Sequence, residues 1–188
     1  MKIGKKQDLI TLKVPKEKRL LIVGNGEQMR LLVKLTSQCF AKDSVFIVSK
    51  RVGDGSEAKK LELLAGKHDF SVHFVDDINA KEVAAKIKRW RSNICVNYGG
   101  LWIFKEEFIG LFKGLFFNYH AANLPDYRGP GDYGWEILNN EKSVSVIIHQ
   151  LIRRVDAGPI LIKKTKKLIG NNIYPIDFHN AIKKLAED

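Results

Sequence analysis

The chain has 188 residues, of which 45% are hydrophobic and 28% are charged, values typical of one globular domain with a substantial core. No apolar run approaches ~20 residues, and the basic N-terminus lacks an apolar segment, which excludes a transmembrane helix and a secretory signal. The formal net charge of +11 would attract RNA, an anionic membrane or a polyanionic small molecule. Because the basic residues are spread along the chain, solvated lysine-rich faces are the simpler explanation.

The cysteine content favours a reduced compartment. Cys39 and Cys95 lie far apart in apolar surroundings and do not have the spacing of metal ligands. We therefore expect a cytoplasmic protein, and we expect no bound metal because no cluster of cysteine and histidine is present.

From the N-terminus, we expect residues 1–18 to form a basic arm or a short extra strand over Leu9–Val14 that ends at Pro15. From Arg19 onward, apolar runs alternate with segments of helical spacing. The predicted strands cover residues 19–23, 45–49, 71–75 and 94–98, and the predicted helices cover residues 27–40, 57–65, 80–91 and 176–185. This alternation predicts an α/β fold with a Rossmann-like, mostly parallel twisted sheet flanked by helices.

A glycine-rich turn, Gly24-Asn25-Gly26, joins the first strand to the first helix. Its backbone N–H groups lie where a phosphate could bind. The turn lacks the G-x-G-x-x-G pattern because position 29 is methionine, and Glu27 would repel a phosphate there. A plain strand-to-helix turn is therefore favoured over a phosphate site.

Residues 114–161 carry most of the functional information. The apolar run Leu115–Phe117 leads to Asn118 and His120, and a second run, Val144–Leu151, leads to Asp156 in a turn-like Asp-Ala-Gly-Pro. An amide, an imidazole and a carboxylate thus follow predicted strands, where the active sites of open α/β sheets collect. Each residue alone could be structural, but together they predict one site.

Four separated elements resemble the folate-dependent formyltransferase family in order and spacing. They are Asn97–Ile103, Asn118–His120 followed by Leu124-Pro125, Tyr127–Gly129, and Asp156–Gly158. The resemblance implies a formyltransferase catalytic domain over residues 19–188. It also implies an N-formyltransferase that takes 10-formyltetrahydrofolate as donor substrate and needs no metal.

The family's chemistry implies a role for each polar residue. An amine attacks the formyl carbon, and negative charge develops on the formyl oxygen, which Asn118 and His120 stabilise as hydrogen-bond donors. Losing one such donor costs about 3–4 kcal/mol in the transition state. Asp156 manages the proton and orients the imidazole. His149 is either an accessory polar contact or a strand residue that points into the sheet.

The resemblance also places the folate. Loop backbone and apolar side chains would hold the pterin, since the ring has a donor–acceptor edge and a flat apolar face. The residues on one side are Gly99, Gly100, Leu101, Trp102 and Ile103, and those on the other are Ile152, Arg153, Arg154 and Val155. A core aromatic is the alternative for Trp102, and plain exposed arginine is the alternative for Arg128 and Arg153.

The acceptor is a small-molecule amine whose identity the sequence constrains weakly. Glu27-Gln28 replace the phosphate-contacting pair of glycinamide ribonucleotide formyltransferases, and from the 188 residues we expect no RNA-binding module of the kind found in methionyl-tRNA formyltransferases. The loop Ala121–Trp135 departs most from the family pattern. Before His149 the family usually has Gly-Val followed by threonine or serine, whereas this chain has Ser145-Val146-Ile147, so the hydroxyl of the third residue is missing. We expect an amino-sugar nucleotide, with a tRNA or ribonucleotide acceptor as the alternative.

A function of another class also fits the charge. The chain could be a non-catalytic, basic RNA-binding module on a formyltransferase fold. RNA affinity that falls steeply with salt, without folate binding, would identify such a module. The sequence predicts no membrane partner and leaves the oligomeric state open.

Overall fold

The computed structural model describes residues 12–131, 133–170 and 173–187. Most of the predicted arm, and half of the strand predicted over Leu9–Val14, lie outside these ranges. The described part of that segment, Leu12–Val14, is not a strand.

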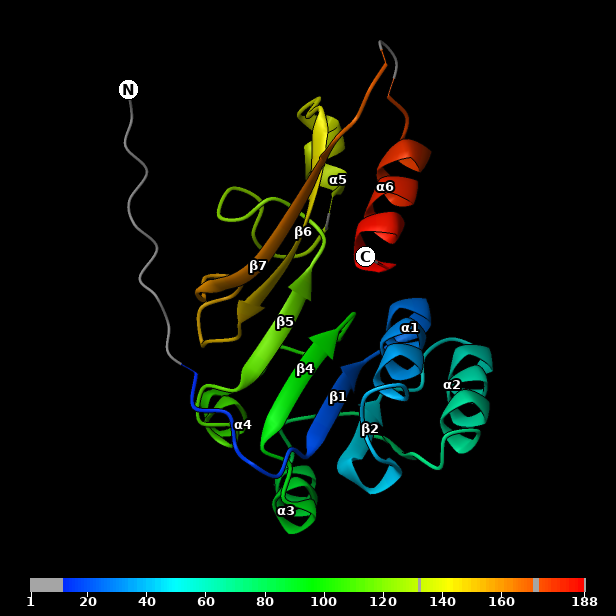
Figure 1. The fold of residues 1–188 in the computed structure, drawn as a ribbon, viewed down its shortest axis with the longest axis vertical. Coiled ribbons are helices and arrows are strands. Elements are labelled where there is room, and N and C mark those ends of the chain that lie inside the picture. The colour runs from blue at the N-terminus through cyan, green and yellow to red at the C-terminus, as the bar shows by residue number, and fades with distance from the viewer. Residues whose placement is uncertain (1–11, 132, 171–172, 188) are drawn as a thin grey trace.

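The elements follow one another as strand–helix units and end in two long strands and a helix (Figure 1). In chain order they are β1 (Leu20–Gly24), α1 (Gly26–Thr36), the 3₁₀ helix η1 (Lys42–Ser44), β2 (Val45–Ser49), α2 (Ser56–Gly66), β3 (Ser71–Phe74), α3 (Lys81–Trp90), β4 (Ile94–Tyr98), α4 (Glu106–Gly110), β5 (Phe116–His120), α5 (Gly134–Leu138), β6 (Ser143–Gln150), β7 (Ile160–Lys167) and α6 (Pro175–Glu187).

The described strands form one seven-stranded sheet in the order β3-β2-β1-β4-β5-β6-β7. Neighbours from β3 to β5 pair in parallel, whereas β6 runs antiparallel to β5 and β7 antiparallel to β6. The predicted α/β fold with a mostly parallel sheet is therefore confirmed. The two antiparallel strands extend the sheet past β5; α5 lies in the connection from β5 to β6, and β7 follows β6 without an intervening helix.

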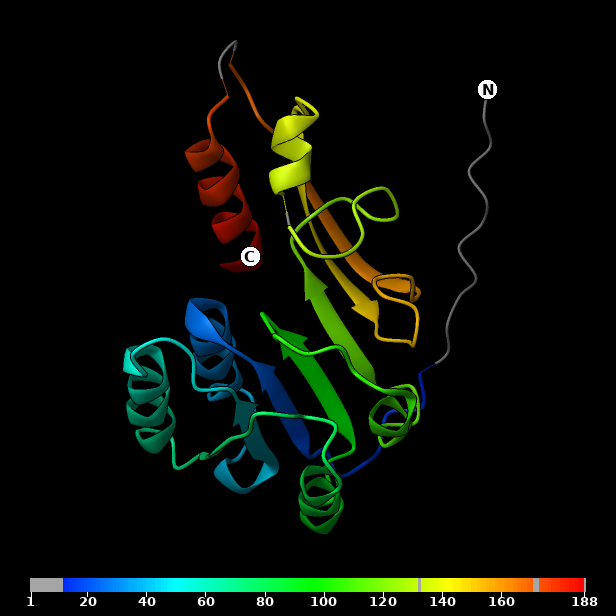
Figure 2. The same cartoon turned by 180° about the vertical axis from the view of Figure 1, so that it is seen from behind.

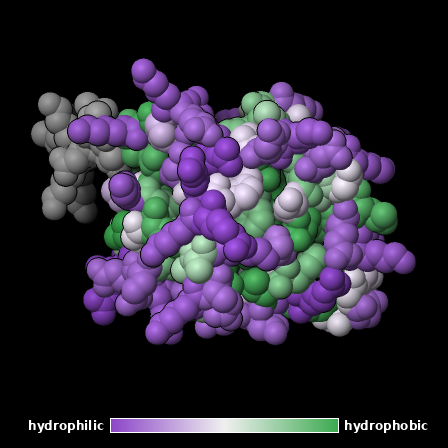
Figure 3. Space-filling model, turned by 90° about the horizontal axis from the view of Figure 1, so that it is seen from below, coloured by the Kyte–Doolittle hydropathy of each residue, from purple (hydrophilic) through white to green (hydrophobic). Residues whose placement is uncertain are grey.

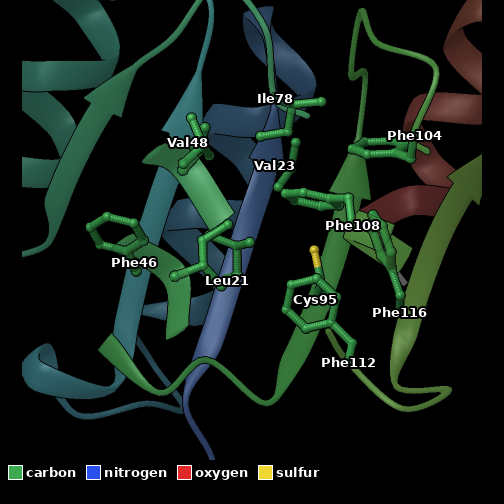
Figure 4. Close-up of a cluster of buried hydrophobic side chains, with 12 residues drawn as sticks. Leu21, Val23, Phe46, Val48, Ile78, Cys95, Phe104, Phe108, Phe112 and Phe116 are labelled. Carbon is green, nitrogen blue, oxygen red and sulfur yellow. The ribbon is translucent and has the colours of Figure 1, made fainter. Parts of the chain in front are cut away.

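Helices cover both faces of the parallel part because successive side chains of a strand point to opposite faces. Ile22 packs with Met29 of α1 and Leu61 of α2 on one face. Leu21 belongs to the cluster on the other face, where α3 and α4 pack (Figure 4). The aromatic members of that second cluster include Phe104, Phe108, Phe112 and Phe116.

The last helix covers the antiparallel part of the sheet. Phe178 and Ile182 of α6 pack against Val144 and Val146 of β6. Figures 1 and 2 show α6 beyond the end of α1, close to β6 and β7. The molecule therefore has α1, α2 and α6 in one layer and α3 and α4 in the other.

The glycine-rich turn between β1 and α1 has a structural explanation. A Cβ on Gly24 would lie only 3.0 Å from the carbonyl carbon of Tyr98, so β1 and β4 approach closely there. Asn25 caps α1, because its side-chain oxygen accepts a 2.7 Å hydrogen bond from Gly26 N–H. These contacts account for the residues of the turn without a ligand.

Several predicted boundaries were wrong. The polar residues Asn118 and His120 lie within β5 instead of after it. Helix α1 ends at Thr36, short of the predicted Phe40, and α4 was not predicted.

Hydrophilic side chains cover much of the face in Figure 3, with apolar side chains between them. No helix in the described ranges has both the length and the apolar character needed to cross a bilayer.

Candidate active site

Strand register brings polar side chains from three neighbouring strands together. Asn118 of β5 lies opposite Asn97 of β4 on one side and opposite His149 of β6 on the other. Alternation along β5 places Asn118 and His120 on the same face as Phe116, which packs against α4. Asn97, Asn118, His120 and His149 are all at least nine-tenths buried.

Asp156, in the turn after β6, links these side chains. Its Oδ1 accepts a 3.1 Å hydrogen bond from Asn118 Nδ2 and lies 3.3 Å from His149 Nε2. Its Oδ2 accepts a 2.9 Å hydrogen bond from Gly129 N–H and lies 3.7 Å from His120 Nδ1. The structure thus brings the predicted Asn118, His120 and Asp156 together and adds His149 to them.

The surroundings of Asp156 favour its ionised form. Burial alone would raise the pKa of the carboxyl group. Hydrogen bonds from His149 and Gly129, together with the nearby His120, outweigh burial and hold the pKa below its ordinary value. The site therefore contains a carboxylate that can accept hydrogen bonds and protons.

His149 faces the site, which answers the question left open by the sequence. Its Nδ1 donates to the Gln150 carbonyl at 3.0 Å, which fixes the ring. Its Nε2 lies 3.1 Å from Asn118 Nδ2 and faces Asp156. This imidazole is 1% exposed and contacts two of the three predicted catalytic residues.

The loop after β5 reaches the site through main-chain atoms. His120 Nε2 donates to the Tyr127 carbonyl at 2.7 Å, next to the Gly129 N–H that binds Asp156. Tyr127 is held by its hydroxyl group, which donates to Glu141 Oε1 at 2.7 Å. Figure 2 shows this segment curling outward from the end of β5 before α5 begins.

Glu136 of α5 fixes the start of the same loop. Its Oε1 accepts a 2.7 Å hydrogen bond from Asn123 N–H, and its side chain is 1% exposed. Burial raises the pKa of this carboxyl group. Sequence reasoning missed Glu136, because one glutamate in a five-residue helix has no distinguishing pattern.

The predicted folate residues fall into two loops that meet near α4. Trp102 and Leu151 pack against the same apolar cluster, and Arg153 Nη1 lies 3.6 Å from Glu106 Oε2. Trp102 is also fixed by a 2.9 Å hydrogen bond from its Nε1 to the Asp76 carbonyl. The exposed apolar side chains of these loops are Leu101, Ile103, Ile152 and Val155. Arg153 and Arg154 are exposed too.

A groove of about 840 Å³ lies on the other face of the sheet, between α1, α2 and α6. It reaches the ends of β4 and β5 at Tyr98, Gly99, Tyr119 and Ala121. Its charged lining residues are Glu27, Arg30, Lys34, Lys60, Lys67 and Lys183. Among the predicted folate residues, Gly99 lines this groove, and the groove adjoins the site at the residues flanking His120.

The rings of Tyr98 and Tyr119 lie against each other at the inner end of the groove, with centroids 4.0 Å apart. Tyr133 lines the same groove, and its hydroxyl lies 3.4 Å from His179 Nδ1. The groove therefore combines flat aromatic surface with an excess of positive charge.

No group of histidine, cysteine and carboxylate side chains among the described residues has an arrangement that could hold a metal ion. Both cysteines are unbridged thiols, Cys39 exposed and Cys95 buried, and burial raises the pKa of the Cys95 thiol well above its ordinary value.

Comparison with solved structures supports the fold. Phosphoribosylglycinamide formyltransferase from Bacillus halodurans superposes with a TM-score of 0.75 at 19% identity, over 90% of this chain and 89% of that chain. Glycinamide ribonucleotide transformylase 1 from Symbiobacterium toebii gives 0.72 at 13% identity, over 94% and 86% of the two chains. A formyltetrahydrofolate deformylase from Pseudomonas syringae pv. tomato gives 0.71 at 17% identity, over 92% and 57%.

A sequence-family model identifies the chain more directly. The model described as Formyl transferase matches residues 18–173, which contain the sheet, the Asn118–Asp156 cluster and both predicted folate loops. The match agrees with the resemblance carried by Asn118–His120 and Asp156–Gly158. The chain therefore belongs to the formyl transferase family and is a formyltetrahydrofolate-dependent enzyme.

Proposed function

We propose that the enzyme transfers the formyl group of 10-formyltetrahydrofolate to a primary amine on a phosphate-bearing small molecule, specifically an amino-sugar nucleotide. The observation that carries this proposal is the groove, because it joins cations and tyrosine rings to the end of β5. Cations bind phosphate, and flat tyrosine rings stack on a nucleotide base. An acceptor without phosphate groups would not need these cations.

In this proposal the acceptor lies in the groove and extends its amine past Gly99 and Ala121 to the polar cluster. The folate lies against the two loops on the other side, with its reactive nitrogen toward Asn118. Leu101, Ile103, Ile152 and Val155 are exposed apolar side chains suited to the face of the pterin. The two substrates would thus approach the formyl carbon from opposite faces of the sheet.

The reaction moves one acyl group and one proton. The amine nitrogen forms a bond to the formyl carbon, and the bond from that carbon to the folate nitrogen breaks. Asp156, held as a carboxylate, accepts the proton that the amine loses, and the folate nitrogen gains a proton as it leaves. Asn118 Nδ2 donates to the formyl oxygen while charge develops there.

His120 supplies the second donor only after a local rearrangement. Its Nε2 now donates to the Tyr127 carbonyl, and its Nδ1 faces Asp156. The formyl oxygen would take the place of the Tyr127 carbonyl. Removal of either donor, by Asn118→Ala or His120→Ala, should lower turnover by about 10²–10³.

The acceptor proposal favours the sugar nucleotide over glycinamide ribonucleotide because Glu27 lies in the first turn of α1. A carboxylate there opposes a phosphate at the helix N-terminus. Lys34 lies further along α1 and Lys60 lies on α2, whereas Lys183 of α6 lies 3.8 Å from Glu27.

An acceptor screen tests the proposal. Purified protein with 10-formyltetrahydrofolate is incubated with amino-sugar nucleotides, glycinamide ribonucleotide, methionyl-tRNA and simple amines, and release of tetrahydrofolate is followed. Turnover with the sugar nucleotides alone supports the proposal. Turnover with methionyl-tRNA or glycinamide ribonucleotide would replace the acceptor while retaining the reaction.

The groove can be tested by charge reversal. Lys34→Glu should raise KM for the phosphorylated acceptor roughly tenfold, about 1.4 kcal/mol, and leave KM for the folate unchanged. Lys59→Glu is the matched control, since this exposed lysine lies on α2 outside the groove lining. Equal effects of the two substitutions would show that net charge, and not the groove, governs acceptor binding.

A further inference from the structure

Asn97 is a buried amide in an otherwise apolar strand, and the proposed reaction gives it no role. Its side chain is 8% exposed. Its Nδ2 donates to Asn118 Oδ1 at 2.6 Å, across the parallel pairing of β4 with β5. The partner of this short hydrogen bond is the proposed formyl-oxygen donor.

The chemistry of the neighbours fixes which way each amide points. An ionised Asp156 can only accept hydrogen bonds, so Asn118 must turn Nδ2 toward it. Asn118 Oδ1 then faces β4, where Asn97 supplies the donor that this oxygen needs. If Asn97 offered an oxygen instead, two acceptors would face each other, and the Asn118 amide would be driven to flip.

The loop after β4 holds Asn97 in turn. A Cβ added to Gly100 would lie 2.9 Å from Asn97 Cγ and would overlap Oδ1, so the loop backbone packs directly on this amide. Asn97 Oδ1 is buried and has no hydrogen-bond partner among the described residues. The amide is thus buried although half of its hydrogen-bonding capacity is unused, which argues that its NH₂ group serves a purpose other than stability.

We propose that Asn97 is a positioning residue for formyl transfer. Its NH₂ group keeps Asn118 Oδ1 turned away from the reacting centre, so that Asn118 Nδ2 stays directed at the formyl oxygen. This inference rests on the proposed role of Asn118. The alternative is a purely structural hydrogen bond between two strands.

Two substitutions separate these explanations. Asn97→Asp keeps the size of the side chain and replaces the donor with an acceptor, whereas Asn97→Leu removes the hydrogen bond without offering an acceptor. We expect Asn97→Asp to lower kcat by roughly 10²-fold, as loss of a formyl-oxygen donor would, with KM for 10-formyltetrahydrofolate within about twofold. Asn97→Leu should lower kcat less, because nothing drives Asn118 to flip.

The dependence on Asn118 is tested by a double-mutant cycle. Adding Asn97→Asp to Asn118→Ala should change kcat by less than about twofold, because the group that Asn97 positions is already gone. Asn93→Asp is the control for an added charge on the same segment, at the opposite end of β4 from the site. If Asn97→Asp retained wild-type kcat, or lowered it equally with and without Asn118, the proposal would be overturned.

A measurement that needs no acceptor tests the positioning role independently of the proposed function. The side-chain NH₂ signals of Asn118 in a ¹H–¹⁵N spectrum can be assigned by their loss in Asn118→Ala. The hydrogen bond to Asp156 should slow exchange of these protons in the wild type, and Asn97→Asp should abolish that protection. Unchanged protection in Asn97→Asp would refute the positioning role, whatever amine the enzyme uses.

Discussion

Gly100→Ala provides a quantitative test of the site, because the space around Gly100 is known. The new Cβ would lie 2.9 Å from Asn97 Cγ, whereas ordinary contact begins at 3.4 Å. The Asn97 amide carbon must therefore move by about 0.5 Å, and its oxygen further. It cannot move toward Asn118, since that hydrogen bond is already 2.6 Å long. The Asn97 amide must therefore move away from Asn118 and lengthen this hydrogen bond.

The expected loss follows from this displacement. A misplacement of 1 Å near a reacting centre can cost about 10²-fold in rate, so a shift of half that size should lower kcat roughly tenfold. Tenfold in rate corresponds to about 1.4 kcal/mol of transition-state stabilisation. Overpacking should also cost about 1–3 kcal/mol of folding free energy. Steady-state formyl transfer and a thermal melt measure the two effects separately.

Two comparisons make this test decisive. Gly110→Ala is the matched control, because a Cβ at that position meets nothing within 4 Å. Asn97→Ala removes the amide that the new methyl group displaces, so Gly100→Ala should add little to it. Full activity in Gly100→Ala, or an equal loss in both backgrounds, would refute the argument.

Three further predictions concern charge, backbone and thiol chemistry. Because the pKa of Asp156 is lower in the folded state, its carboxylate stabilises the fold at pH values above the ordinary pKa of 3.8, and this contribution is lost as pH falls through the folded pKa. The difference in unfolding free energy between wild type and Asp156→Asn, measured in denaturant melts, should therefore shrink below pH 3.8. A difference that does not depend on pH would contradict this prediction. Gly158→Ala places a Cβ 2.8 Å from the backbone carbon of Gln150 and should lower the melting temperature by several degrees, unlike Gly66→Ala, whose Cβ meets nothing. A thiol reagent should modify one thiol, Cys39, in the native protein and a second only on unfolding; rapid modification of two native thiols would show that Cys95 is accessible.

The sequence predicted most of the parallel sheet because buried strands leave a clear signature. Val45–Ser49 and Ile94–Tyr98 match β2 and β4 at both ends, since each is an apolar run bounded by polar residues or glycine. Helix α4 was not predicted because five residues are too few to display a helical period. The antiparallel direction of β6 and β7 was also not predicted, because side chains alternate between the two faces of the sheet in the same way in either strand direction.

The site was predictable in its parts and not in its contacts. Asn118, His120 and Asp156 could be selected from motif spacing and chain position. The contribution of Asn97 depends on the register of β4 against β5, which the sequence of a strand does not specify. The contacts of Tyr127 and Gly129 use a carbonyl oxygen and an amide hydrogen, which every such residue possesses and which no residue type reveals.

Those main-chain contacts have a consequence for how the loop after β5 can change in sequence. The loop after β5 meets His120 through the Tyr127 carbonyl and Asp156 through the Gly129 amide, while Arg128 lies between these two positions. Substitutions at Arg128 or Asp126 alter the side chains that the loop displays and leave both backbone hydrogen bonds in place. Backbone contacts with the site and side-chain identity on the loop surface are therefore separable within nine consecutive residues, 121–129. We expect substitutions at these two side-chain positions to leave formyl transfer intact.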